Sequence, residues 1–190
     1  MKKLKFFAMA VCAATFLMSG SLTAQNMKKD TKMVGGAEMY PSKNIVENAV
    51  NSKDHTTLVA AVTAADLVGV LQGEGPFTVF APTNAAFEKL PAGTVETLLK
   101  AENKETLQGV LTYHVIAGDF KAADVLAAIK SGNGTATFKT VNGVELNAML
   151  DGEAVKLKDA AGNVATVTMA DVNQSNGVIH VIDTVLLPGK

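Results

Sequence analysis

Arginine and tryptophan are absent from this sequence of 190 residues, and cysteine occurs only once, as Cys12. Because all 17 basic residues are lysines, the chain lacks the planar guanidinium group that binds phosphates and carboxylates through paired hydrogen bonds. The basic residues do not outnumber the 18 acidic ones, so no strongly positive surface is expected. We therefore predict that nucleic acid is not a partner. An Arg-Gly-Asp adhesion motif is excluded because the sequence has no arginine.

The first 24 residues have the pattern of a cleavable signal peptide. Lys2, Lys3 and Lys5 form a basic start, and residues 6–18 form an unbroken run of apolar or small residues that is followed by a small residue at Ala24. This run is too short for a membrane-spanning helix, which needs roughly 20 apolar residues. We predict cleavage after Ala24, no membrane span, and a mature protein in the periplasm or outside the cell.

Cleavage would change both the charge and the thiol chemistry of the chain. It removes three of the 17 lysines and none of the 18 acidic residues, which leaves a net charge of −4. It also removes Cys12, so the mature protein has neither a disulfide nor a thiol nucleophile. Stability must therefore come from a packed core.

The mature chain divides into a short tail and one domain. Residues 25–42 are polar, rich in lysine and methionine, and interrupted by Gly35, Gly36 and Pro41, a composition that predicts a flexible spacer. Residues 43–188 are long enough to bury a hydrophobic core, and they are predicted to form one globular domain.

Helix signals dominate the first part of this domain. Asn44, Thr56 or Thr57, and Thr83 or Asn84 are N-cap residue types that precede apolar residues at helical spacing. Together with similar patterns further along the chain, they predict six helical segments: 45–50, 58–71, 85–89, 95–100, 104–111 and 122–129.

Strand signals dominate the last third of the chain. One earlier strand is predicted at 77–80, where aromatic and β-branched residues precede Pro82. From Thr135 onward, short alternating runs are separated by Asn-Gly at 142–143 and Asp-Gly at 151–152, which are the residue pairs that hairpin turns favour. Helices first and strands later, without regular alternation, predict an α+β fold with an antiparallel sheet.

The usual arrangements of catalytic and metal-binding residues are missing from the sequence. His55, His114 and His180 are far apart, and no two have the spacing of a zinc-binding helix. A run starting at Asp171 resembles the beginning of a calcium loop, but Ile182 occupies the position that requires a bidentate glutamate. We therefore predict no metal, no cofactor and no enzymatic activity. A pair of carboxylates brought together only by folding stays open.

The residues Tyr113 and His114 allow two interpretations. They could form an exposed contact point for a partner, or they could lie in the core with their polar atoms hydrogen-bonded. The core role is favoured because large rings are usually at least partly buried. His180 shares a strand face with Val178 and Ile182 and is predicted to be a core histidine with hydrogen-bond partners.

Three segments together resemble the fasciclin domain. They are residues 77–87, the Tyr113-His114-Val115 triplet, and residues 175–188, which are similar to the two signature boxes of that family and its central Tyr-His motif. Their order and spacing agree with the family over about 43–188. Within the boxes, we assign structural roles to the following residues: Phe80, Pro82, Thr83, Asn84, Phe87, Asn176, Gly177 and His180.

This resemblance implies a fold and a class of function. It implies a wedge-shaped antiparallel β-sandwich flanked by helices from the N-terminal half, which serves as an extracellular adhesion module without catalytic activity. The implied partner is a protein or polysaccharide of a cell surface or extracellular matrix. The implied contact residues are Tyr113, His114, Asp171 and Val172. The Asp171-Val172 pair departs from the Asp-Ile dipeptide of the family, which weakens an inference of integrin binding.

Two functions therefore stay open. The first is adhesion or attachment to a surface or matrix, which a single domain can mediate only if it has two binding faces or forms a homo-oligomer. The second is an extracellular carrier of an apolar small molecule such as a pigment or lipid. The resemblance implies it, because some fasciclin-domain proteins bind apolar pigments, and the chain has enough aliphatic and methionine residues to line a groove.

Overall fold

The computed structural model describes residues 31–189 of the protein. The predicted signal peptide, 1–24, and the first part of the predicted spacer, 25–30, lie outside the described residues. Within the described range the α-helices are α1 (Ile45–Ala49), α2 (Thr56–Ala64), α3 (Val68–Gln72), α4 (Asn84–Glu88), α5 (Thr94–Leu98), α6 (Lys104–Tyr113) and α7 (Ala122–Ser131).

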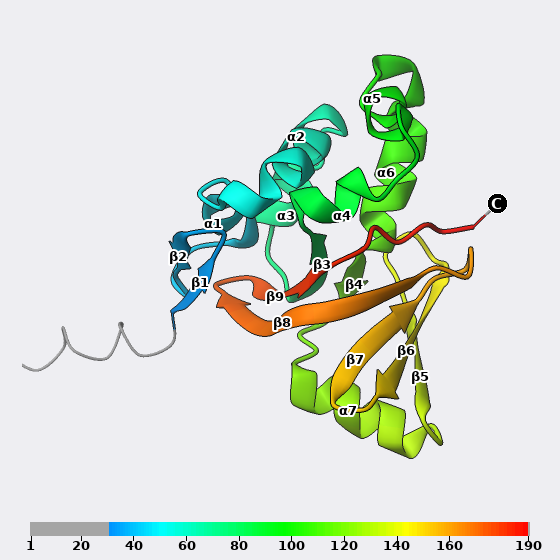
Figure 1. The fold of residues 1–190 in the computed structure, drawn as a ribbon. Coiled ribbons are helices and arrows are strands. Elements are labelled where there is room, and N and C mark those ends of the chain that lie inside the picture. Colours follow the sequence, from blue (N-terminus) through cyan, green and yellow to red (C-terminus); the bar gives the residue numbers. More distant parts are fainter. Residues whose placement is uncertain (1–30, 190) are drawn as a thin grey trace, which may run out of the picture.

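The strands form a small hairpin and one large sheet (Figure 1). The hairpin pairs the first two strands, and the large sheet has the order β4-β3-β9-β8-β7-β6-β5. The strands are β1 (Lys32–Val34), β2 (Ala37–Met39), β3 (Phe77–Pro82), β4 (Val115–Ala117), β5 (Thr135–Lys139), β6 (Glu145–Asp151), β7 (Ala154–Lys158), β8 (Val164–Gln174) and β9 (Gly177–Ile182).

The predicted helix caps are partly correct. Asn44 caps α1 in a reciprocal capping box with Glu47, and the Thr83 side chain accepts a hydrogen bond from the backbone N–H of Ala86 at the start of α4. The residue at the N-cap of α2 is His55, so the prediction of Thr56 or Thr57 at this position is wrong. Thr56 is instead the first helical residue.

The predicted helix over 58–71 is two helices, α2 and α3, because the chain turns between them at Asp66. This residue has a φ of 60°, in the left-handed region that is incompatible with a continuing α-helix. Asn84 also differs from its predicted role. Its side chain accepts from the N–H of Thr57 and donates to the carbonyl of Lys53, so it supports the start of α2 rather than capping α4.

The large sheet is antiparallel except for one pair of strands. β3 and β9 run parallel, with Phe77 opposite Gly177 and Pro82 opposite Ile182. Gly177 has a φ of 153°, and a Cβ atom there would lie 2.0 Å from the carbonyl oxygen of Phe77, so only glycine fits. The α+β class is confirmed, and the parallel pair is a local departure from the predicted antiparallel pairing.

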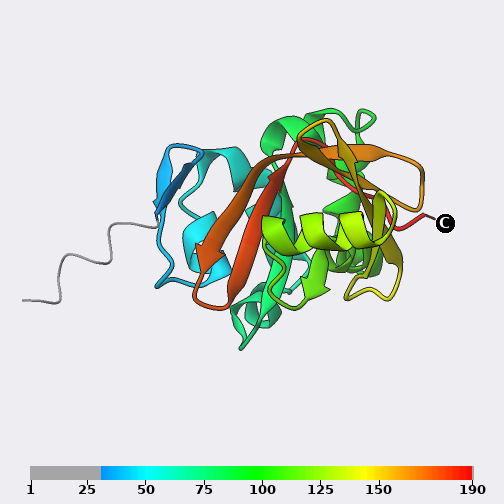
Figure 2. The same cartoon turned by 90° about the horizontal axis from the view of Figure 1, so that it is seen from below.

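The sheet separates two cores. β8 is the longest strand and has register shifts between Val167 and Met169 and between Met169 and Val172, as β-bulges produce. Below it, β5, β6 and β7 diverge from β9 in Figure 1, and α7 crosses these strands in Figure 2. We call the cluster that includes Tyr113, Ile129, Leu146, Leu157 and Ile182 the α7-side core. The cluster that includes Ile45, Leu58, Val62, Leu71, Val79 and Val115 is the helical-side core.

The prediction of a flexible spacer is wrong for residues 31–42. The β1–β2 hairpin lies within this range, and its Val34 and Met39 side chains are buried in the helical-side core. The Lys32 ammonium donates to the carbonyl of Ala170 on β8, and the N–H of Tyr40 donates to the side chain of Asn48. These contacts supply the apolar burial and hydrogen bonds that the composition of the segment alone did not reveal.

Candidate functional site: an apolar cavity beside the sheet

The structure places Tyr113 and His114 inside the protein. Tyr113 is fully buried, and its hydroxyl donates to the carbonyl of Glu145 and accepts from the N–H of Ala160. His114 is 3% exposed, and its Nε2 atom accepts from the N–H of Leu186 at 3.0 Å. Its Nδ1 atom therefore carries the proton. Both residues have the hydrogen-bonded packing role that was one of the two interpretations of this motif.

A buried carboxylate completes this arrangement. Asp159 is 4% exposed and accepts from the N–H and side-chain amide of Asn163 and from the N–H of Leu187. Burial lowers the pKa of His114 to about 4, although the Val110 carbonyl and the Asp159 charge act in the opposite direction. Asp159 was missed in the sequence, where the glycine-containing turn that follows it was the only signal. His114 and Asp159 together hold the backbone of Leu186 and Leu187.

Asp171 and Val172 do not form a surface contact pair. Val172 is 1% exposed and belongs to the helical-side core, whereas Tyr113 belongs to the α7-side core. Asp171 has a φ of 55°, and its carboxylate accepts from the N–H of Ala122 at 2.7 Å, at the first residue of α7. Its own N–H donates to Nδ1 of His180. Asp171 thus joins β8 to α7.

The remaining box residues connect distant segments. His180 is hydrogen-bonded through both ring nitrogens, with Nε2 at 2.8 Å from the carbonyl of Phe120, and it stacks on the ring of Phe80. The Asn176 amide donates to the carbonyls of Leu71 and Gly73, while its oxygen accepts from the N–H of Ile45. Pro82 and Phe87 are buried.

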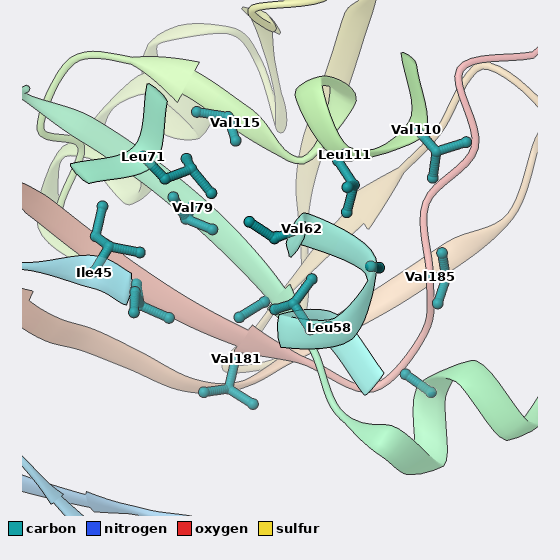
Figure 3. Packing of buried hydrophobic residues seen from close by; sticks show 14 of the residues in the cluster. Ile45, Leu58, Val62, Leu71, Val79, Val110, Leu111, Val115, Val181 and Val185 are labelled. Carbon is teal, nitrogen blue, oxygen red and sulfur yellow. The ribbon is translucent and has the colours of Figure 1, made fainter. Parts of the chain in front are cut away.

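An apolar cavity of about 340 Å³ lies in the helical-side core. It is bounded by α1, α2 and α3, by the β1–β2 hairpin, and by β3, β4 and β9. Figure 3 shows Leu58, Val62 and Leu71 from the helices together with Val79 of β3 and other members of this core. Its volume falls within the range of about 300 to 1,000 Å³ that is typical of small-molecule sites.

Charged side chains do not line this cavity in the described part of the chain. Among its polar residues, Thr63 and Thr112 donate to carbonyls of their own helices, and His114 is paired as described above. Ser52 Oγ lies 2.9 Å from Nδ1 of His55. Burial lowers the pKa of His55, with the Ala81 backbone and Asp54 acting in the opposite direction.

Exposed valines surround the cavity. Val50 and Val70 are each 54% exposed, Val141 is 47% exposed, and all three also line the cavity. They come from the end of α1, from α3 and from the β5–β6 connection, which are distant in the sequence. The cavity therefore opens to the surface through an apolar rim.

A second hollow, of about 710 Å³, is more polar than the first, and we call it the polar hollow. It lies where the turn before β3 meets the turn between β8 and β9, and Asn173, Ser175, Glu74, Asp119 and Lys121 are among the residues that line it. Amide, hydroxyl and carboxylate groups of this kind can donate and accept hydrogen bonds to a polar partner.

Residues 31–189 show neither a metal-binding cluster nor a membrane-spanning helix. No group of three or more histidine, cysteine, aspartate or glutamate residues is arranged to hold a metal ion within that range. The same residues contain no helix that is both long enough and apolar enough to cross a membrane.

Comparison with known proteins gives consistent matches. The family model of the fasciclin domain matches residues 53–188. Protein sll1483 of Synechocystis sp. is 51% identical over 160 residues, which cover 82% of this chain and 79% of that protein. Cell surface glycolipoprotein MPB83 of Mycobacterium bovis is 34% identical over 188 residues, which cover 95% of this chain and 76% of that protein.

A solved structure has the same fold. It is a FAS1 domain pair from the insect cell adhesion molecule Fasciclin I, which matches with a TM-score of 0.53 and 24% sequence identity. The match covers 66% of this chain and 42% of that chain.

Proposed function

Because the chain belongs to the fasciclin-domain family, we propose that it is an exported, non-enzymatic binding domain that attaches to a protein or polysaccharide at a cell surface or in an extracellular matrix. The observation that carries this proposal is the match to cell surface glycolipoprotein MPB83, which covers 95% of this chain. The cell adhesion molecule Fasciclin I has the same fold. The signal peptide predicted at residues 1–24 would deliver the protein to this environment.

The hydrogen bonds of His114 and His180 support a structural role for these two residues rather than a catalytic one. His114 and His180 each use both ring nitrogens in hydrogen bonds that hold the fold together. Neither ring has a free nitrogen with which to accept a proton from a substrate.

The polar hollow is our candidate contact surface for this partner. Tyr113, His114 and Val172 are too deeply buried to touch a partner that docks on the folded surface. Ser175 is exposed and Asn173 is half-buried at the hollow, so both can reach such a partner. The Ser175 hydroxyl and the Asn173 amide are hydrogen-bonding groups of the kind that recognise polysaccharides and polar protein surfaces.

The test is saturable binding of the purified mature protein, residues 25–190, to the cells that produce it and to their extracellular polymer. Ser175→Lys should weaken binding several-fold, because it places a long charged side chain in the hollow. The control is Thr137→Lys, which changes an exposed position on β5, remote in the sequence and in the sheet order. Binding that does not saturate would contradict the proposal, and equal binding by the two variants would exclude the hollow as the contact.

Light scattering should also give the oligomeric state, since attachment of two surfaces requires two binding faces or self-association.

A second candidate function is favoured by the cavity: an extracellular carrier of an apolar small molecule. A hollow of about 340 Å³ inside a core is costly to leave empty, because its lining side chains lose packing contacts. An apolar ligand would restore those contacts and would enter past the exposed rim valines.

This candidate is tested by displacement of the uncharged fluorescent probe N-phenyl-1-naphthylamine and by native mass spectrometry of protein isolated from its own cells. Ala49→Leu adds bulk to a residue that lines the cavity, and it should reduce probe binding at least tenfold. The control is Ala64→Leu, which makes the same change at an exposed position of α2. If the probe binds both variants as it binds the wild type, or binds none of them, the carrier function is wrong.

A further inference from the structure

His55 lines the apolar cavity and has an unpaired polar atom. Its side chain is 3% exposed, and among residues 31–189 its Nε2 is the one buried side-chain nitrogen or oxygen without a hydrogen-bond partner. The backbone of Ala81 raises the pKa of His55, but it does not form a hydrogen bond with Nε2. Buried polar groups in proteins are nearly always paired, so this exception requires an explanation.

The surroundings of the ring restrict what its missing partner can be. Nδ1 is already engaged by the Ser52 hydroxyl, which leaves Nε2 as the atom that is available. Because Ser52 can donate to or accept from Nδ1, the Nε2 atom can be either an acceptor or a donor. A hydroxyl group can pair with it in both cases. A carboxylate or ammonium group is disfavoured, because no charged side chain lines the described cavity to compensate for burying it.

We propose that the cavity binds a neutral, apolar alcohol whose hydroxyl group forms a hydrogen bond with Nε2 of His55. This inference rests on the carrier function, and it adds the chemical class of the ligand and the residue that recognises it. The aliphatic lining holds the hydrocarbon part, and His55 selects for the single polar group. The ligand reaches the ring from the cavity, since His55 lines it while remaining closed to solvent.

A pair of substitutions separates the two ring nitrogens. His55→Asn retains an amide near the position of Nδ1, which keeps the contact with Ser52 and removes Nε2. His55→Gln places its amide near the position of Nε2. The ligands are octan-1-ol and nonane, which have the same size and differ in the hydroxyl group, and displacement of N-phenyl-1-naphthylamine measures their binding.

Octan-1-ol should bind the wild type about tenfold more tightly than it binds His55→Asn, as expected for loss of one buried hydrogen bond. Nonane should bind both proteins equally, and His55→Gln should recover part of the octan-1-ol affinity. If octan-1-ol and nonane are affected equally by His55→Asn while the probe still binds, the role of His55 is wrong and the carrier function stands. If no apolar compound binds the wild type, the carrier function and this inference fail together.

A measurement on the wild-type protein keeps the test valid if His55→Asn does not fold. In protein with ¹⁵N-labelled histidine, octan-1-ol should shift the Nε2 resonance of His55 in the NMR spectrum, and nonane should leave it unchanged. The paired rings of His114 and His180 serve as internal controls. Identical shifts with both ligands would overturn the proposal.

Discussion

The two cores of this protein differ in how completely their buried polar groups are hydrogen-bonded and in how tightly their apolar side chains pack. Around Tyr113, His114 and Asp159, each buried polar side chain is paired with the backbone of a distant segment. The helical-side core encloses a cavity of about 340 Å³ and a histidine with an unpaired nitrogen. The hydrogen-bonded residues of the Tyr-His motif therefore hold distant segments together, whereas the helical-side core has the space for a ligand, although His114 also lines its cavity.

The largest expected effect comes from truncating one leucine in each core. Leu157→Ala should lower the free energy of unfolding by about 4 kcal/mol, because Leu157 is fully buried in the α7-side core. Leu71→Ala should cost only about 2 kcal/mol, because Leu71 already faces a cavity and loses fewer contacts. Chemical denaturation measures both values, and equal losses would mean that the two cores are packed alike.

Acid should act mainly through His114. Its pKa is about 4 in the folded state and about 6.5 when unfolded, so the unfolded chain binds the proton first as the pH falls. This pKa difference contributes about 3 kcal/mol to the free energy of unfolding, which is fully present above pH 6.5 and is lost as the pH falls to about 4. Burial lowers the pKa values of His55 and His180 too, which adds to this loss.

Denaturation curves at intervals between pH 7 and pH 4 measure this dependence. His114→Gln should be less stable at neutral pH and should show a shallower slope with pH, because the titrating ring is gone. A slope that is unchanged in this variant would assign the acid sensitivity to other groups.

Removing one buried hydroxyl group from each region should destabilise the protein more where that hydroxyl has more hydrogen-bond partners. Tyr113→Phe should cost about 2 kcal/mol, because it leaves the carbonyl of Glu145 and the N–H of Ala160 without their partner. Ser52→Ala should cost about 1 kcal/mol, because within residues 31–189 its hydroxyl has one hydrogen-bond partner, the His55 ring. Thermal unfolding provides the comparison, and a larger loss for Ser52→Ala would reverse it.

The smallest effect on stability is expected at the cavity rim. Val70→Ser changes a side chain that is 54% exposed, so the free energy of unfolding should change by less than about 0.5 kcal/mol. Binding of N-phenyl-1-naphthylamine should weaken several-fold if the rim is the entrance. Val164→Ser is the control, since Val164 is 44% exposed and does not line the cavity. Equal probe binding by the two variants would move the entrance elsewhere.

Local signals predicted local structure well. Asn44 and Thr83 cap the helices that they precede, because an N-cap depends on backbone groups only two or three residues away. The hairpins after Thr135 follow from turn residues in the same way. Pairing between distant segments was not predictable by such reasoning. Asn84 lies at a helix start as expected, but its side chain serves α2 instead of α4.

The candidate site was the least predictable feature. The sequence indicated aliphatic residues sufficient for a groove, but no pattern within it placed Val34 of the hairpin beside Leu71 and Val115. His55 carried no sequence motif at all. Its significance depends on burial and on the absence of a hydrogen-bond partner in the described structure, which are both properties of the folded chain.

The α+β class, the family, and the positions of most helices and hairpins could be predicted from the sequence, because these depend on composition, short-range hydrogen bonding and motif order. The parallel pairing of β3 with β9, the packing of residues 31–42 against the core, and the burial of Tyr113 and His114 became visible in the folded structure. The folded structure also shows where the cavity lies. These features depend on which side chains from distant segments fill the same space, and a linear pattern does not encode that complementarity in a readable form.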